Sequence, residues 1–108
     1  GVEEAEKVVK EKKRALEIEE EKLRQREAER QKVLDHQDAK LQQLRQEFDQ
    51  GTTSDKITQM KEYLKVVQER VKVEDKKVKD QKQQVEVAEK NVELAKNQLK
   101  QREKEQDK

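Results

Sequence analysis

The sequence has no cysteine, no proline and only two glycines among its 108 residues. Because no thiol is present, disulfide bonds and thiolate metal sites are excluded. Because no proline is present, no residue interrupts a helix from within. Hydrophobic residues make up 29% of the chain and aromatic residues 2%, against roughly 45–50% apolar residues in ordinary globular domains. A thick hydrophobic core is therefore excluded.

Long hydrophobic runs are also absent. No stretch approaches the roughly 18–20 apolar residues of a membrane-spanning helix, and the N-terminus has no recognisable signal peptide. We therefore expect no integral membrane segment. The chain begins at Gly1 inside a repeat and ends at Lys108 without a helix stop signal, so we expect a fragment of a longer protein.

An excess of charge of one sign is missing as well. The chain is 49% charged, but its 27 basic and 26 acidic residues leave a net charge of +1. The two signs are interleaved, for example Glu3 with Lys7 and Glu86 with Lys90, and each such pair stabilises a helix by about 0.2–0.5 kcal/mol. No basic face remains, so we expect no nucleic-acid binding.

The residues that are present, mostly Glu, Lys, Gln, Arg and Ala, favour helices. The one break lies near the middle of the chain, where Gly51 can end a helix with a positive φ. Thr52, Thr53 or Ser54 can cap the next helix, and Thr52 with Asp55 resembles a capping box. We predict one helix over residues 2–50, a turn over 51–54 and a second helix over 55–107.

The second predicted helix has an unbroken heptad repeat. One row is apolar throughout, and a companion row follows at the alternating spacing of three and four residues. Such a pattern is typical of a coiled-coil seam and argues against disorder. The first row is Ile57, Leu64, Val71, Val78, Val85, Val92 and Leu99, and the companion row is Met60, Val67, Glu74, Gln81, Ala88, Ala95 and Arg102.

The first predicted helix has a less regular repeat, because its phase changes once between Leu23 and Leu34. Such a stutter locally unwinds a supercoil. Folding the chain at Gly51 aligns the two apolar patterns in antiparallel order, with the numbers of facing residues adding to about 105. The predicted fold class is therefore all-α, a two-helix antiparallel coiled-coil hairpin. The heptad row of the first helix is Val2, Val9, Leu16, Leu23, Arg30, Gln37 and Leu44, and its companions are Ala5, Lys12 and Glu19, then Leu34, Leu41 and Phe48.

This register predicts apolar layers near the turn, with Phe48 in the core against Ile57. We therefore expect firm packing near the turn and thinner packing toward the open end. Farther from the turn, Arg30 falls opposite Glu74. That pair has two interpretations: a buried polar pair that sets the register, or a partly solvated surface pair of little energetic weight.

Catalysis has little support in the sequence. His36 is the only histidine and lies off the seam, which indicates a solvated helix position. Catalytic groups must converge on a substrate in a pocket, and a two-helix hairpin offers no such pocket. We predict no enzyme activity, no catalytic residue, no metal site and no cofactor.

Two features favour partner binding. A second apolar stripe lies two residues after the main row of the second helix, about 200° around the helix axis. Tyr63 lies off the seam near the turn, where we expect it to be exposed. The alternative for the stripe is ordinary surface, on which scattered apolar residues are normal. The candidate partner-binding residues are Tyr63, Val66, Val73, Val87 and Leu94.

Two segments resemble a known family. They are AEKVVKEKKRALEIEEEKLRQREAERQKV, residues 5–33, and GTTSDKITQMKEYLKVV, residues 51–67. Both resemble the chlamydial member of the type III secretion stalk family, which is called YscO in injectisomes and FliJ in flagella. The GTTSD turn with the YLKVV that follows is the specific part of the resemblance. Residues 72–108 resemble the family only in their general composition and pattern.

The resemblance implies a monomeric, non-catalytic stalk in the bacterial cytoplasm, peripheral to the secretion apparatus at the inner membrane. Its implied partners are the type III export ATPase, the cytoplasmic domain of the export gate and the chaperones of translocator proteins. The mid-hairpin and turn side would face the export gate, which makes Tyr63 and Val66 the preferred binding candidates. The alternative function is a generic structural scaffold or dimerisation rod.

Overall fold

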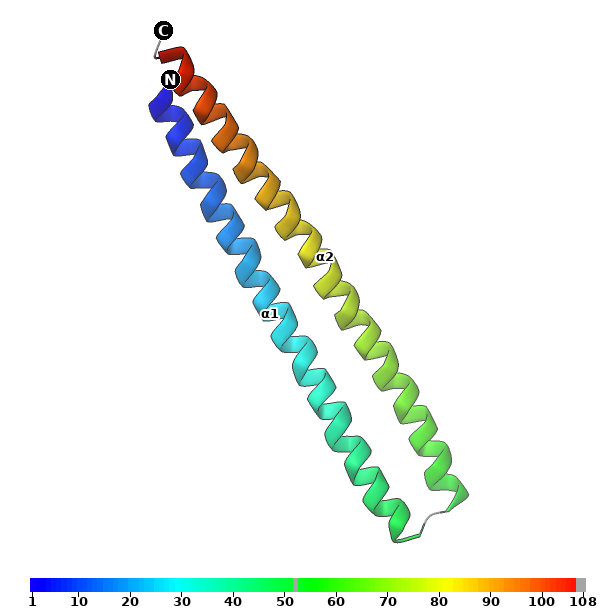
Figure 1. Ribbon diagram of the computed structural model, residues 1–108. Coiled ribbons are helices and arrows are strands. Elements are labelled where there is room, and N and C mark those ends of the chain that lie inside the picture. Colours follow the sequence, from blue (N-terminus) through cyan, green and yellow to red (C-terminus); the bar gives the residue numbers. More distant parts are fainter. Residues whose placement is uncertain (52, 107–108) are drawn as a thin grey trace. The chain divides into compact units, whose positions relative to one another are not determined.

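The computed structural model describes residues 1–51 and 53–106, and these residues form two helices and no strand. Helix α1 spans Val2–Asp49, and helix α2 spans Ser54–Gln106. The chain reverses direction at the turn between them (Figure 1). The predicted all-α fold, an antiparallel two-helix hairpin, is therefore confirmed.

Helix α1 ends at a glycine cap. Gly51 has a φ of 97°, and its N–H donates a hydrogen bond of 3.0 Å to the carbonyl oxygen of Phe48. A side chain disfavours this left-handed conformation, whereas glycine adopts it readily. Beyond the chain neighbours, no heavy atom lies within 4 Å of the place that a Cβ of Gly51 would take. The backbone angle, and not crowding, therefore favours glycine here.

Helix α2 begins after Thr53, which acts as its N-cap. The carbonyl oxygen of Thr53 accepts a hydrogen bond of 3.1 Å from the N–H of Ile57, and its Oγ1 accepts a longer one of 3.4 Å from the N–H of Lys56. Asp55 lies in the first turn, where a negative charge interacts favourably with the helix dipole. The capping role predicted for Thr52 lies outside the described residues.

The chain divides into two compact units, each of which pairs a part of α1 with a part of α2. The turn unit is Arg26–Val78, and the terminal unit consists of Gly1–Gln25 and Lys79–Lys108. Within each unit the side chains of the predicted seam provide the buried interior.

The seam predicted for the second helix is confirmed by burial. Every position of its two rows from Ile57 to Leu99 is buried or half-buried, and only the last member, Arg102, is exposed. The seam also buries one charged residue, Glu74, which is 3% exposed. The buried apolar residues are Leu44, Val67 and Val78 in the turn unit, and Val9, Val85, Ala88, Val92 and Ala95 in the terminal unit.

Two packing predictions are corrected by this distribution. Phe48, predicted as core, is 37% exposed, because it lies in the last turn of α1, where the seam ends. The terminal unit, predicted to be thinly packed, holds five of the eight buried apolar residues. Its small seam residues Ala88 and Ala95 are themselves well covered, since small side chains at a contact let two helices approach closely.

Candidate partner-binding surface

Tyr63 is held on the flank of the turn unit by two residues of α1. Its hydroxyl shares a hydrogen bond of 3.1 Å with Nε2 of His36, and Nζ of Lys40 lies 5.4 Å from the centre of its ring. A lysine at that distance from the ring makes a cation–π contact. These contacts leave Tyr63 half-buried, which corrects the prediction that it is exposed, whereas His36 is exposed as expected.

A shallow groove lies beside Tyr63 in the turn unit, with a volume of about 380 Å³. Val66 lines it and is 68% exposed, the highest value among the large apolar residues described. The structure thus brings the two preferred candidates, Tyr63 and Val66, to one groove. We call it the Tyr63 groove; its lining residues are Glu29, Lys32, Val33, His36, Tyr63, Val66, Val67 and Arg70.

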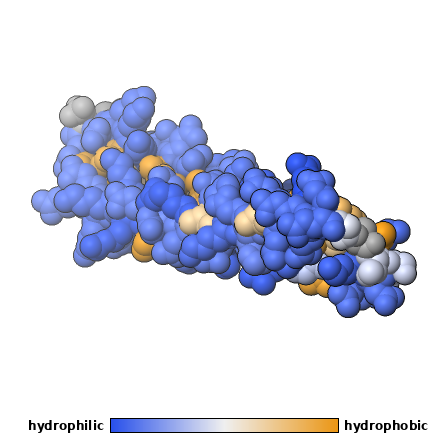
Figure 2. All heavy atoms as spheres, turned by 90° about the horizontal axis from the view of Figure 1, so that it is seen from below, coloured by the Kyte–Doolittle hydropathy of each residue, from blue (hydrophilic) through white to orange (hydrophobic). Residues whose placement is uncertain are grey.

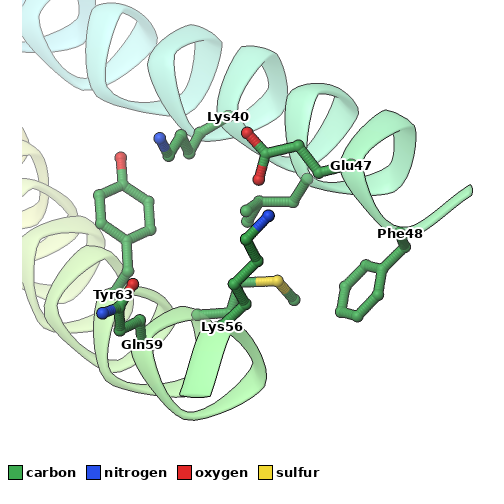
Figure 3. A pocket seen from close by; sticks show the side chains of 8 residues that line it. Lys40, Glu47, Phe48, Lys56, Gln59 and Tyr63 are labelled. Atoms are coloured by element: carbon green, nitrogen blue, oxygen red, sulfur yellow. The ribbon is translucent and has the colours of Figure 1, made fainter. Parts of the chain in front are cut away.

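A second hollow of about 330 Å³ shares Tyr63 with the groove and lies nearer the turn. Figure 3 shows Lys40 and Glu47 reaching from α1, and Lys56 from α2, toward the space between the two helices. Leu44 and Met60, which the predicted register places opposite each other, line this hollow together. The complete lining is Lys40, Leu44, Glu47, Phe48, Lys56, Gln59, Met60 and Tyr63.

The outer stripe on α2 is exposed to solvent. Val73 in the turn unit is 49% exposed, and Val87 and Leu94 in the terminal unit are 53% and 60% exposed. On the face shown in Figure 2, apolar residues form small separate spots on a mostly hydrophilic surface. The role of these residues in binding a partner stays a prediction.

Arg30 and Glu74 do not form the predicted pair. Nε of Arg30 lies 2.8 Å from Oδ1 of Asp75, and it is buried without a directed hydrogen bond, so the contact is an ion pair. Oε1 of Glu74 lies 3.6 Å from Nε of Arg70 and 3.5 Å from Nζ of Lys77, both on its own helix. Glu74 occupies the seam itself, whereas the half-exposed side chain of Asp75 lies at its edge, within reach of Arg30.

Gln81 makes a cross-helix contact in the terminal unit that the heptad pattern does not reveal. Its Nε2 donates hydrogen bonds to the carbonyl oxygen of Glu19 over 2.9 Å and to Oε2 of Glu19 over 2.6 Å. The hydrogen bond from Gln81, helped by the charge of Lys22 and opposed by partial desolvation, lowers the pKa of Glu19 below its usual value of 4.5. Both residues occupy seam positions, but the predicted register places Leu23 opposite Gln81, about one turn away.

Most charged side chains of the described residues are exposed. Seven of the eight ion pairs among them join neighbours on one helix, and in four of these both side chains are largely exposed, for example in Arg24 with Glu21. No cluster of three or more histidine, cysteine, aspartate or glutamate side chains suited to a metal ion occurs among them. Over the same residues, neither helix combines the length and the apolar character needed to cross a membrane.

Comparisons with known proteins identify relatives. A family model described as YscO-like protein matches residues 1–108. The structure of a YscO homologue, CT670 from Chlamydia trachomatis, matches 98% of this chain with 52% sequence identity and a TM-score of 0.91, and the chain spans 65% of that longer one. A chain from the Chlamydia pneumoniae CdsV and CdsO protein complex matches with 52% identity and a TM-score of 0.71, over 78% of this chain and 98% of that chain. No curated protein sequence matches significantly.

Proposed function

Because the chain belongs to the YscO-like family, which is associated with type III secretion, we propose that it is a non-catalytic coiled-coil stalk of a type III secretion export apparatus. In this role it links the export ATPase ring to the export gate and binds the chaperones of translocator proteins. It acts in the bacterial cytoplasm, peripheral to the apparatus at the inner membrane.

The main support for a contact with the export gate is the Tyr63 groove. It presents Val66, 68% exposed, beside the half-buried ring of Tyr63, on a unit whose other apolar side chains are mostly turned into the seam. The similar chain from the CdsV and CdsO complex comes from a structure that contains two proteins. We propose that a CdsV-like export-gate domain occupies the groove of the present chain.

This contact should be small and short-lived. The groove is shallow, and transient assemblies commonly bury less than about 1,200 Å² in total. Glu29, Lys32 and Arg70 supply charges of both signs around the apolar residues. Reversing these charges should mainly change the association rate, whereas truncating the apolar anchors should mainly raise the dissociation rate.

The geometry also supports a non-catalytic role. In the Tyr63 groove the hydroxyl of Tyr63 and the exposed His36 are hydrogen-bonded to each other on a shallow, open surface. Catalysis needs its groups to converge on a substrate in a pocket. The chain therefore contributes contacts and stiffness, and the hydrolysis of ATP belongs to its ATPase partner.

The test replaces Tyr63 and Val66 together by serine. The double variant should bind the purified cytoplasmic domain of the export gate at least tenfold more weakly, since it loses both anchors, while circular dichroism shows unchanged helicity. A matched control changes Val87 and Leu94, which lie in the other unit, to serine and should bind the gate normally. Undiminished binding by the first variant would show that the groove is not the interface.

A generic scaffold or dimerisation rod is the alternative function, and the exposed stripe of Val73, Val87 and Leu94 favours it. The two functions differ in their partners. A stalk should be retained in separate pull-downs by the export ATPase, by the gate domain and by a translocator chaperone. If the chain bound none of these three partners, the scaffold function would be the better account.

A further inference from the structure

The outer face of α2 in the terminal unit carries a ridge that is almost free of charge. Its members recur at spacings of three and four residues, so they share one face of the helix. Every member is exposed, and Lys90 is the only charged one in a chain that is 49% charged. We call this surface the amide ridge; it consists of Gln83, Gln84, Val87, Lys90, Asn91, Leu94, Asn97 and Gln98.

This composition is unlike that of the solvated faces beside it. The exposed residues that flank the ridge on the same stretch of helix include Glu86, Glu93 and Lys96. Depletion of charge is the compositional mark of the centre of a protein interface. Val87 and Leu94 provide the apolar centre of the ridge and are 53% and 60% exposed.

Apart from Lys90, whose counterpart is Asn91, the ridge has the same order of amide and apolar residues in both directions along the helix. Its midpoint lies between Lys90 and Asn91. Two copies laid antiparallel would therefore bring valine near leucine and amide near amide. An amide side chain both donates and accepts hydrogen bonds, so it can pair with another amide. The pairs related by the midpoint are Gln83 with Gln98, Gln84 with Asn97 and Val87 with Leu94.

We infer that the amide ridge is a self-association surface on which a second copy of this chain packs, α2 against α2 in antiparallel order. A two-fold interface requires a surface that is complementary to itself, and the ridge meets this requirement in the order of its amide and apolar residues, with Lys90 as its one charged member. An unrelated helix would gain nothing from the reversed order. The ridge contains neither Tyr63 nor Val66, so this association is separate from the proposed contact with the export gate.

The association is weak, because the ridge is short. It covers about 16 residues, or roughly 24 Å of helix, whereas stable interfaces bury about 1,200–2,000 Å². The chain is therefore monomeric when dilute, as a stalk requires, and pairs where its local concentration is high.

The absence of cysteine from the chain allows a direct test by cross-linking. Asn91→Cys places one thiol next to the midpoint of the ridge. Ile18→Cys places a thiol at a position on α1 that is 52% exposed and serves as the matched control. With a short bis-maleimide at high protein concentration, Asn91→Cys should form dimers at least tenfold faster than Ile18→Cys. Equal rates would overturn the proposal.

A second substitution separates true pairing from random collision. Adding Leu94→Lys to Asn91→Cys removes an apolar contact, adds like charges to those of Lys90 and should lower cross-linking to the level of the Ile18→Cys control. Adding Val73→Lys, the same kind of change in the turn unit, should have no effect. Cross-linking that persists with Leu94→Lys while circular dichroism is unchanged would refute pairing through the ridge. Loss of binding to the export ATPase or gate by Leu94→Lys, with no dimer at any concentration, would assign the ridge to that partner instead.

Discussion

Two polar residues of α2 lie in the seam and are accommodated in different ways. Gln81 satisfies its amide by hydrogen bonds to Glu19 on the facing helix. Glu74 is buried to 3% exposure, yet the cations nearest to it, Arg70 and Lys77, belong to its own helix and are largely exposed. The first residue joins the two helices, whereas the second is a buried charge with weak, solvated partners. They should therefore respond differently to substitution.

Replacing Gln81 with alanine should remove a pH-dependent part of the stability. Gln81 lowers the pKa of Glu19 in the folded state below the usual 4.5, so the unfolded chain binds this proton more readily than the folded chain does. The stabilisation is therefore fully present above the unfolded pKa and is lost as the pH falls through the lowered folded pKa. The melting temperature of the variant should lie below that of the wild type at pH 7, and the gap should narrow below pH 4.5.

Circular dichroism melts across this pH range provide the measurement. Gln68→Ala, at an exposed glutamine of α2, is the control and should run parallel to the wild type at every pH. A part of the gap caused by Gln81→Ala should remain in acid, since the hydrogen bond to the carbonyl oxygen of Glu19 does not titrate. A gap that is the same at pH 7 and pH 3 would contradict the role assigned to the Glu19 carboxylate.

Replacing Glu74 with leucine should leave the free energy of unfolding unchanged or raise it, by up to about 2 kcal/mol. A buried charge pays for desolvation, and an apolar residue of similar size in its place is often neutral or stabilising. Denaturant unfolding would measure the change. Glu69→Leu, at a residue whose side chain is 73% exposed, should change stability by less than about 0.5 kcal/mol. Clear destabilisation by Glu74→Leu would mean that its contacts with Arg70 and Lys77 contribute net stability.

At the scale of the elements, the turn is defined by two neighbouring helix ends with different chemistry. Helix α1 ends because Gly51 takes a positive φ, and helix α2 begins because the carbonyl oxygen and Oγ1 of Thr53 accept its first N–H groups. Neither device depends on packing against the other helix. Both are local, and so their residues were recognisable from the pattern of the sequence.

Gly51→Ala should lower the free energy of unfolding by about 1–2 kcal/mol, which is the usual penalty for a Cβ in the left-handed region. The space around Gly51 is open, so the effect would come from the backbone and not from a clash. Gly51→Asn should cost less than Gly51→Ala, since asparagine tolerates this conformation better. Chemical denaturation of the three proteins would test the order, and equal stability of Gly51→Ala and the wild type would contradict it.

At the scale of the whole molecule, the two units differ in how many buried apolar residues they hold. Five of the eight buried apolar residues belong to the terminal unit, although its seam includes two alanines. Local stability follows the density of buried apolar contacts. The order of stability expected from the heptad pattern, with the turn end firmest, should therefore be reversed.

Hydrogen exchange would measure this order directly. Backbone amides around Val85, Ala88 and Val92 should exchange most slowly, and those around Leu44 and Val67, in the interior of the turn unit, should exchange faster. The last turns at the chain ends are excluded from the comparison, because helix ends fray. Slower exchange in the turn unit than in the terminal unit would restore the original expectation and show that buried side chains alone do not decide local stability here.

The sequence by itself determined the features that depend on local chemistry and periodicity. Helix-favouring composition without proline gave two long helices, Gly51 and Thr53 marked the turn, and the heptad rows identified the buried face of α2. The outward stripe of Val66, Val73, Val87 and Leu94 followed from the same period, since a position two residues after a seam residue points away from the facing helix. Two specific segments also sufficed to identify the family.

Only the tertiary structure decided which residue meets which across the seam. Facing side chains can reach neighbours up to a turn away, so the pairing depends on rotamers and helix spacing that a one-dimensional pattern does not contain. Arg30 therefore meets Asp75 and not Glu74, and Gln81 meets Glu19. For the same reason the pattern does not predict burial near the turn. Tyr63, expected to be exposed, is half-covered by its contacts with α1. Phe48, expected in the core, is exposed because the seam ends at the last turn of that helix.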